Sequence, residues 1–133
     1  ATESAASASV RAVLTPAQIV ALQQLIRELY ADERIKGYLV ELVAATRDPR
    51  AYGLPELSDF VQYGASPRAT LALLSTARAH AFLQGRGYVV PEDVKEVAPD
   101  VLRHRVLLSY EAEAENVTSD QVVSRILERI EVP

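Results

Sequence analysis

Residues 64–69 read GASPRA and place an arginine, Arg68, in the first turn of a predicted helix. Ser66 is expected to be the N-cap and Pro67 the first helical residue, because serine and proline are favoured at those positions. A cation in the first turn faces the positive end of the helix dipole and is unfavourable by about 0.3–1 kcal/mol. An anion in front of the helix reverses this, because helix N-termini and arginine side chains both bind phosphate. The pattern therefore makes Arg68 a candidate phosphate ligand.

Apolar residues at helical spacing predict five amphipathic helices that share one core. These helices are expected to start at Thr15, Asp32, Ser66, Pro91 and Thr118. Two short apolar runs, 88–90 and 106–108, are expected to pair as a minimal two-stranded β element. The sequence thus predicts a mainly α fold.

Two segments lack a helical pattern. Residues 1–14 are rich in alanine and serine and are expected to be a linker or the tail of a preceding domain, with the helical domain spanning residues 15–133. Residues 48–65 form a long connection that contains prolines and glycines, and connections of this length are usually functional or flexible.

The composition excludes several classes of function. The chain has 133 residues, no cysteine, and 14 Lys and Arg against 18 Asp and Glu, which gives a net charge of −4. The absence of cysteine excludes disulfides, a cysteine-ligated zinc site and thiol catalysis. The two histidines, His80 and His104, do not form a local metal motif, so no metal site is expected. The negative charge argues against nucleic-acid binding, including by a helix-turn-helix domain.

Membrane and targeting signals are also missing. Residues 1–12 do not have the basic and apolar regions of a signal peptide, and no apolar run approaches the ~20 residues that span a bilayer. We therefore expect no membrane insertion and, by default, a cytoplasmic protein.

Catalytic motifs are absent as well. The lysines, Lys36 and Lys95, do not follow a glycine as in a phosphate-binding loop, and neither G-x-S-x-G nor H-E-x-x-H occurs. Glu92 and Asp93 are interpreted as a favourable helix start with solvated carboxylates, and His80 as a packed or surface residue. The chain by itself is not expected to be an enzyme.

Residues 64–69 resemble the sensor-2 motif of the MoxR family of AAA+ ATPases. Four further segments resemble the same family in the same order, namely 42–47 (LVAATR), 77–81 (ARAHA), 85–94 (GRGYVVPEDV) and 98–105 (APDVLRHR). The resemblance covers about residues 15–133. It departs at Val90, where the family usually has a threonine whose hydroxyl caps the helix.

This resemblance implies that the chain is the C-terminal helical lid of a larger ATPase. The N-terminal AAA+ core would hold the phosphate loop, and ATP and Mg²⁺ would bind the full-length parent and not this segment alone. Arg68 would be sensor 2, reaching the γ-phosphate and acting in catalysis. Ala65 and Ser66 would lie near the adenine or ribose of the nucleotide.

The family resemblance also implies an assembly. Its members form homo-hexameric rings, act as chaperone-like remodellers and often work with proteins that contain von Willebrand factor A domains. Arg47, Arg103 and Arg105 are candidates for contacts between subunits in such a ring. The alternative for each of them is a cation at the C-terminal end of a helix, where the dipole favours positive charge.

Two further alternatives remain open from the sequence. Arg68 could form an ordinary surface ion pair with Glu56 or Asp59 of the preceding connection. The whole chain could instead be a free-standing helical adaptor that binds a protein partner through residues 48–65, without nucleotide chemistry.

Overall fold

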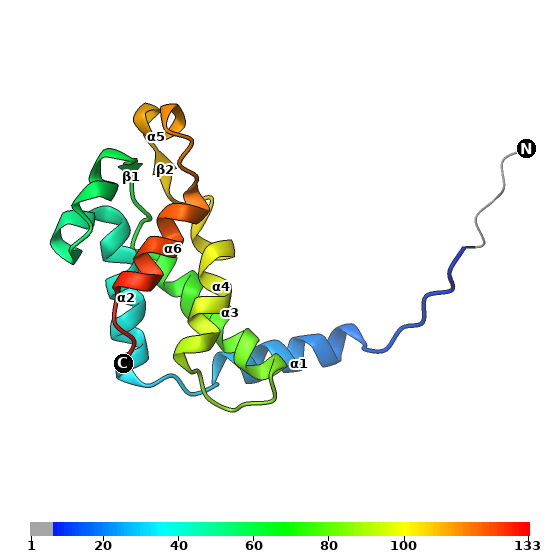
Figure 1. Cartoon of the computed structure of the whole chain (residues 1–133). Coiled ribbons are helices and arrows are strands. Elements are labelled where there is room, and N and C mark those ends of the chain that lie inside the picture. Colours follow the sequence, from blue (N-terminus) through cyan, green and yellow to red (C-terminus); the bar gives the residue numbers. More distant parts are fainter. Residues whose placement is uncertain (1–6) are drawn as a thin grey trace, which may run out of the picture.

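The structure, a computed structural model, describes residues 7–133, and within this range the chain forms six α-helices, two 3-10 helices and two short strands (Figure 1). The α-helices are α1 (Pro16–Arg27), α2 (Glu33–Arg47), α3 (Arg68–Leu83), α4 (Pro91–Leu102), α5 (Tyr110–Ala114) and α6 (Ser119–Arg129). The 3-10 helices are η1 (Pro49–Tyr52) and η2 (Pro55–Asp59), and the strands are β1 (Val61–Tyr63) and β2 (Leu107–Leu108). Residues 7–14 have no helix or strand, and residues 1–6 of the predicted linker lie outside the described residues.

Helices α2, α3, α4 and α6 form the bundle, and their apolar faces meet in one core (Figure 1). The largest side chains of this core are fully enclosed, with exposed fractions of 0–1% for Leu39, Leu42, Leu73, Leu102 and Ile126. Each belongs to one of these four helices, as their predicted apolar stripes require. The predicted mainly α bundle is confirmed.

Helix α1 projects away from the bundle, and none of its residues is buried (Figure 1). Its apolar stripe stays largely in solvent, with exposed fractions of 44% for Ile19 and 56% for Leu25. Leu29, which is buried, follows the end of the helix. The prediction that this stripe joins the shared core is therefore wrong for α1, because α1 packs mainly against α3 and its N-terminal part projects away from the bundle.

The predicted β element exists, but one of its two partners is different. Strand β2, within the run 106–108, pairs antiparallel with β1 and not with residues 88–90. Tyr88 instead forms an isolated bridge with Tyr30, in which the Val89 N–H donates to the Tyr30 carbonyl oxygen at 2.9 Å. Short apolar runs of this kind do not specify their partners, so the tertiary packing decides them.

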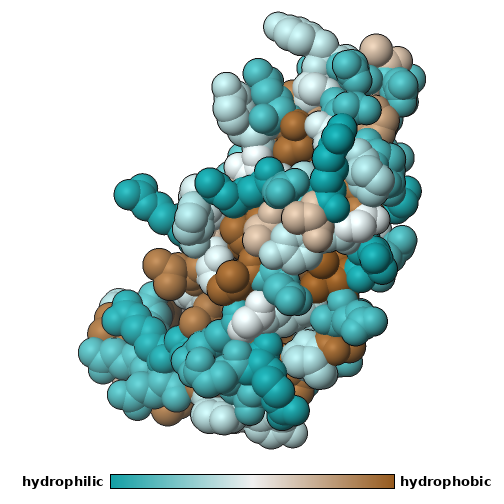
Figure 2. Space-filling model, turned by 90° about the vertical axis from the view of Figure 1, so that its left-hand side faces the viewer, coloured by the Kyte–Doolittle hydropathy of each residue, from teal (hydrophilic) through white to brown (hydrophobic). Residues whose placement is uncertain are grey.

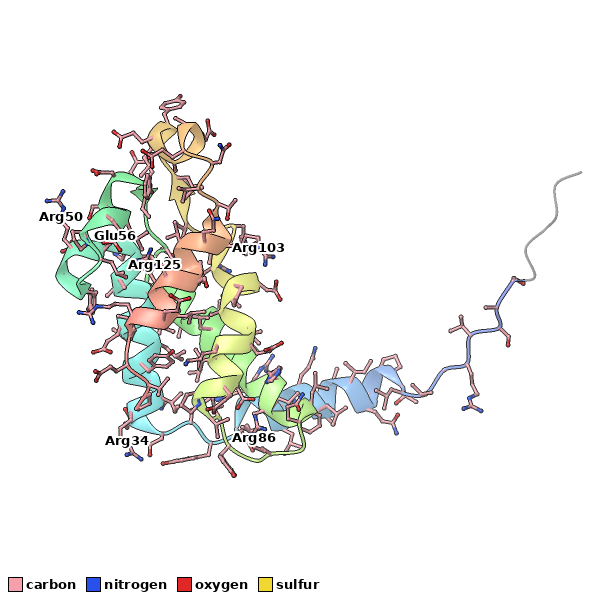
Figure 3. All side chains as sticks on the ribbon, in the orientation of Figure 1. Arg34, Arg50, Glu56, Arg86, Arg103 and Arg125 are labelled. Atoms are coloured by element: carbon pink, nitrogen blue, oxygen red, sulfur yellow. The ribbon has the colours of Figure 1, made fainter. Side chains whose placement is uncertain are left out.

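The predicted long connection, residues 48–65, has regular structure, since it contains η1, η2 and β1. Two contacts tie it to later parts of the chain. Glu56 of η2 pairs with Arg125 of α6 at 2.6 Å, as Figure 3 shows, and the Ser109 hydroxyl donates to the Asp59 carbonyl oxygen at 2.6 Å. The segment is therefore part of the folded domain.

Side chains cap most of the helices. The predicted capping boxes at Thr15 and Thr118 are present, and Asp32 caps α2. Ser109 caps α5, a short helix in a polar segment for which no helix was predicted. Helix α3 lacks a side-chain cap.

The surface of the molecule carries both hydrophilic and hydrophobic side chains. On the face turned away from α1, apolar side chains break a mainly hydrophilic surface in several separate places (Figure 2). No helix in the described part of the chain is long and apolar enough to cross a lipid bilayer.

Candidate functional site

Helix α3 begins at Arg68, with Pro67 as its N-cap residue and without a side-chain hydrogen bond to the first turn. The Ser66 side chain forms no hydrogen bond with the first turn, so the side-chain cap predicted for it is absent, and the assigned helix begins at Arg68. Pro67, directly before it, already has helical angles (φ −56°, ψ −23°), and the Ala69 N–H bonds the Ser66 carbonyl oxygen at 2.9 Å.

The Arg68 side chain is exposed and has no hydrogen bond or ion pair within residues 7–133. The two carboxylates considered as its partners, those of Glu56 and Asp59, form no ion pair with Arg68. Glu56 pairs with Arg125, and Asp59 forms no ion pair in the described part of the chain. The guanidinium is thus free at the start of α3, whereas the Ala69 and Thr70 N–H groups of the first turn donate to the Ser66 and Pro67 carbonyl oxygens at 2.9 and 3.1 Å. What this end of the helix offers an anion is therefore the Arg68 side chain and the positive end of the helix dipole.

The two residues that lead into α3 lie against the C-terminal end of α2. A Cβ on Gly64 would lie within 2.3 Å of the Thr46 carbonyl oxygen and 2.6 Å of the Arg47 Cα, so only glycine permits this approach. The Ala65 N–H donates to Thr46 Oγ1 at 2.9 Å, and Arg47 Nη1 donates to the Ala65 carbonyl oxygen at 3.2 Å. The Thr46 hydroxyl itself donates to the Val43 carbonyl oxygen at 2.6 Å. The end of α2 therefore fixes the path of the chain into α3.

The predicted nucleotide-contacting residues differ in exposure. Ser66 and Arg68 are on the surface, whereas Ala65 is fully buried. Both polar backbone atoms of Ala65 are bound within the chain, its N–H by Thr46 and its carbonyl oxygen by Arg47, so Ala65 offers no exposed atom to a ligand in this structure.

A hollow of about 430 Å³ lies between α1 and α3. Leu71, Ser75 and Arg78 line it and follow Arg68 at helical spacing, so the four residues share one face of α3. Arg78 also joins the two helices, because its Nε donates to the Leu29 carbonyl oxygen at 2.9 Å. Arg68 thus stands at the N-terminal end of a face that α1 borders.

The start of α4 carries a cluster that the sequence did not predict. The Asp93 side chain is fully buried and accepts hydrogen bonds from the Val90 N–H at 2.8 Å, from His80 Nδ1 at 2.7 Å and from Arg86. Burial by itself would raise the pKa of Asp93, but the hydrogen bonds from Val90, Arg86 and His80 together hold this pKa below its ordinary value. The cluster ties the end of α3 to the start of α4.

The prediction that Asp93 favours the helix start is correct, but the prediction of a solvated carboxylate is wrong for this residue. Its burial is offset by Arg86 in the preceding turn, which pairs with it, and by a hydrogen bond with His80 of α3. The position of Asp93 three residues after Val90, where it caps the free Val90 N–H, was visible in the sequence. The two basic partners depend on how α3 packs against α4, which local patterns do not give.

The three arginines proposed for contacts between subunits all have partners inside this chain. Arg47 bonds the backbone of the segment before α3, as described above. Arg103 pairs with Asp120 at 2.7 Å and with Asp100 at 3.0 Å, and Arg105 Nε donates to the Val101 carbonyl oxygen at 3.0 Å. Their role between subunits stays a prediction.

Acidic and histidine side chains do not gather into a metal site in the described part of the chain. Within residues 7–133, no group of three or more histidine, aspartate or glutamate residues could hold a metal ion.

The chain resembles known proteins over most of its length. Residues 57–126 match the family described as AAA lid domain. Chaperone MoxR1 of Mycobacterium tuberculosis is 38% identical over 121 residues, which cover 91% of this chain and 32% of that protein. Protein MoxR of Methylorubrum extorquens is 37% identical over 109 residues, which cover 77% of this chain and 32% of that protein.

A solved structure agrees with the sequence relatives. A crystal structure from Cytophaga hutchinsonii, whose description names an ATPase, superimposes with a TM-score of 0.86 at 41% identity. The match covers 88% of this chain and 36% of that one, so the chain spans about a third of the length of these relatives. With a family match over more than half of its residues, this chain belongs to the AAA lid domain family, as a lid domain of the MoxR type.

Proposed function

We propose that this chain is the lid of a longer ATPase and closes over ATP bound to an AAA+ core, with Arg68 as the sensor-2 arginine. The single observation that carries the proposal is the start of α3, where the exposed Arg68 guanidinium has no hydrogen bond or ion pair within residues 7–133. The relatives support the setting, because the chain spans about a third of proteins that include a chaperone and an ATPase.

The chemistry of the site suits a terminal phosphate. The first turn of α3 supplies the positive end of the helix dipole, and Arg68 supplies donors in a planar fork. Without an anion this arrangement is unfavourable by about 0.3–1 kcal/mol, and a phosphate in front of the helix makes it favourable.

In this proposal Arg68 acts in two ways. Its positive charge stabilises the charge that is spread over the transferring phosphoryl group in the transition state. Because the arginine belongs to the lid while the nucleotide lies on the core, the same contact couples the state of the nucleotide to the position of the lid. Ser66 is exposed two residues before Arg68 and is proposed to lie near the nucleoside, together with its buried neighbour Ala65.

The finer assignments are proposals of the same kind. We propose that the full-length protein binds Mg²⁺ with ATP, assembles as a homo-hexameric ring in the cytoplasm and remodels partner proteins. Proteins with von Willebrand factor A domains are the partners expected from the family resemblance. Arg47, Arg103 and Arg105 are proposed to extend their contacts to a neighbouring subunit.

The test measures ATP turnover of the full-length protein. Replacement of Arg68 by alanine is expected to lower kcat by about 100-fold or more, the usual cost of removing one donor that stabilises the transition state. Arg68→Lys retains the charge but not the fork and is expected to restore only part of the activity. Arg50→Ala is the matched control, because Arg50 is exposed and has no ion pair within residues 7–133.

The control fixes how the results are interpreted. Turnover that Arg68→Ala leaves at the level of Arg50→Ala would reject Arg68 as sensor 2.

A further inference from the structure

We propose that Thr46 and Arg47, the last two residues of α2, are positioning residues for Arg68. They bind the backbone of Ala65 and so fix the direction in which α3 presents its first side chain. This inference rests on the sensor-2 role proposed above and names the residues that make that role possible.

Thr46 is placed for this task by its burial and its hydrogen bonds. The residue is fully buried. Its hydroxyl donates to the Val43 carbonyl oxygen at 2.6 Å, a bond within its own helix. The same oxygen accepts the Ala65 N–H at 2.9 Å, a bond that leaves the helix. Because Ala65 is fully buried too, water cannot take over this hydrogen bond if the hydroxyl is removed.

Arg47 binds the carbonyl oxygen of Ala65, the residue whose N–H is bound by Thr46. Its Nη1 donates to the Ala65 carbonyl oxygen at 3.2 Å. Two consecutive residues of α2 thus hold both the N–H and the C=O of Ala65. The two peptide groups on either side of the Ala65 Cα are therefore each held by one hydrogen bond, and neither can rotate without losing it.

Gly64 adds a steric constraint to these hydrogen bonds. Its Cα lies so close to α2 that an added Cβ would meet the Thr46 carbonyl oxygen at 2.3 Å. The chain is therefore pressed against the end of α2 immediately before the bound peptide. Only Ser66 and Pro67 stand between Ala65 and Arg68, and the proline ring fixes φ of its own residue.

Arg68 itself has no internal partner that could set its direction. Its side chain is exposed and unpaired within residues 7–133, and no side chain caps the first turn of α3. Its position therefore depends on the backbone that leads into the helix. Because a displacement of about 1 Å at a reacting centre can lower the rate by about 100-fold, a loosened Ala65 is expected to affect turnover.

The experiment uses the full-length ATPase and measures both ATP turnover and hydrogen exchange of the Ala65 amide. The main variant is Thr46→Val, which keeps the branched shape and removes the hydroxyl. Thr46→Ser restores the hydroxyl. The matched control is Thr76→Val, because the Thr76 hydroxyl donates only to the Ala72 carbonyl oxygen of its own helix, at 2.7 Å.

Thr46→Val is expected to speed exchange of the Ala65 amide and to lower kcat about tenfold, with a smaller change in the KM for ATP. Thr46→Ser is expected to recover most of kcat. Thr76→Val is expected to leave both the exchange of Ala65 and kcat near the parent values. Equal effects of Thr46→Val and Thr76→Val on kcat would overturn the inference.

A second variant covers the case in which Thr46→Val does not fold. Arg47→Met removes the donor to Ala65 at an exposed position and keeps the apolar stem of the side chain. It is expected to lower kcat severalfold and to speed exchange of the Ala65 amide. Unchanged kcat in a folded Arg47→Met protein would reject Arg47 as a positioning residue.

Double variants separate positioning from a purely structural role. If Thr46 acts through Arg68, Thr46→Val is expected to lower kcat very little once Arg68 is already alanine. Full multiplication of the two effects would show that Thr46 acts independently and would overturn the inference. If Arg68→Ala alone leaves turnover unchanged, the sensor-2 proposal itself fails, which is a different result.

Discussion

The N-terminal ends of α3 and α4 lie on two helices that pack against each other, yet their chemistry is opposite. Helix α4 starts with a buried carboxylate, Asp93, which binds one backbone N–H and two basic side chains. Helix α3 starts with an exposed cation, Arg68, and has no side-chain cap. The first end is satisfied within the chain, so its role is to hold the fold. The second presents a guanidinium that has no partner within residues 7–133 and is available to the ligand proposed above.

The largest loss of stability is expected when the charge of Asp93, at the start of α4, is removed. Asp93→Asn should lower the free energy of unfolding by about 3 kcal/mol, because it leaves Arg86 and His80 without their buried counter-charge. Urea unfolding of the chain at neutral pH measures this change. A loss below about 0.5 kcal/mol, the range of ordinary surface substitutions, would show that the cluster does not hold α3 to α4.

A somewhat smaller loss of stability is expected from a substitution at Gly64, in the segment that leads into α3. Gly64→Ala should lower the free energy of unfolding by about 1–3 kcal/mol, because its Cβ would overlap the backbone of α2. Gly37→Ala is the control, since a Cβ there meets nothing within 4 Å and a glycine in the middle of a helix costs about 0.5–1 kcal/mol relative to alanine. The two substitutions should therefore have opposite signs in urea unfolding, and equal signs would contradict the close approach of Gly64 to α2.

The pH dependence of stability tests the cluster around Asp93 as well, and the expected change in the free energy of unfolding is smaller. The folded chain holds the pKa of Asp93 below its ordinary value, so the carboxylate contributes stability above the unfolded-state pKa of about 3.9. This contribution is lost as the pH falls through the folded-state pKa. Unfolding free energies measured from about pH 5 downward should fall more steeply for the parent chain than for Asp93→Asn. Identical slopes would mean that Asp93 does not titrate as described.

The smallest effect on stability is expected at the start of α3. Arg68→Ala should leave the free energy of unfolding unchanged within about 0.5 kcal/mol or raise it slightly, because an exposed, unpaired cation at a helix N-terminus is removed. Urea unfolding beside Asp93→Asn gives the direct comparison. A loss of more than about 1 kcal/mol would assign Arg68 to the fold of the lid and not to a ligand.

Local rules in the sequence predicted those features that depend on neighbouring residues. The capping boxes of Thr15 and Thr118 were predicted correctly, because the cap and its partner are three residues apart. The Ser66 side-chain cap was not, because that side chain forms no hydrogen bond with the first turn of α3. Arg68 stands in the first turn as predicted, and its role as a site residue stays a prediction.

Features that depend on contacts between distant residues were not predicted. The partner of β2 and the burial of Asp93 follow from the way the helices pack, and the short apolar run 106–108 does not encode a partner. The exposed apolar stripe of α1 was not predicted for the same reason. Helical periodicity indicates that a helix has an apolar face, but it does not indicate what covers that face. The contacts of Thr46 with Ala65 likewise join residues that no local rule connects.

A structure of the full-length protein with a non-hydrolysable ATP analogue tests the central claim most directly. We expect a guanidinium nitrogen of Arg68 within about 2.7–3.2 Å of a γ-phosphate oxygen, in front of the first turn of α3. An analogue bound in the core while Arg68 faces solvent would contradict the account.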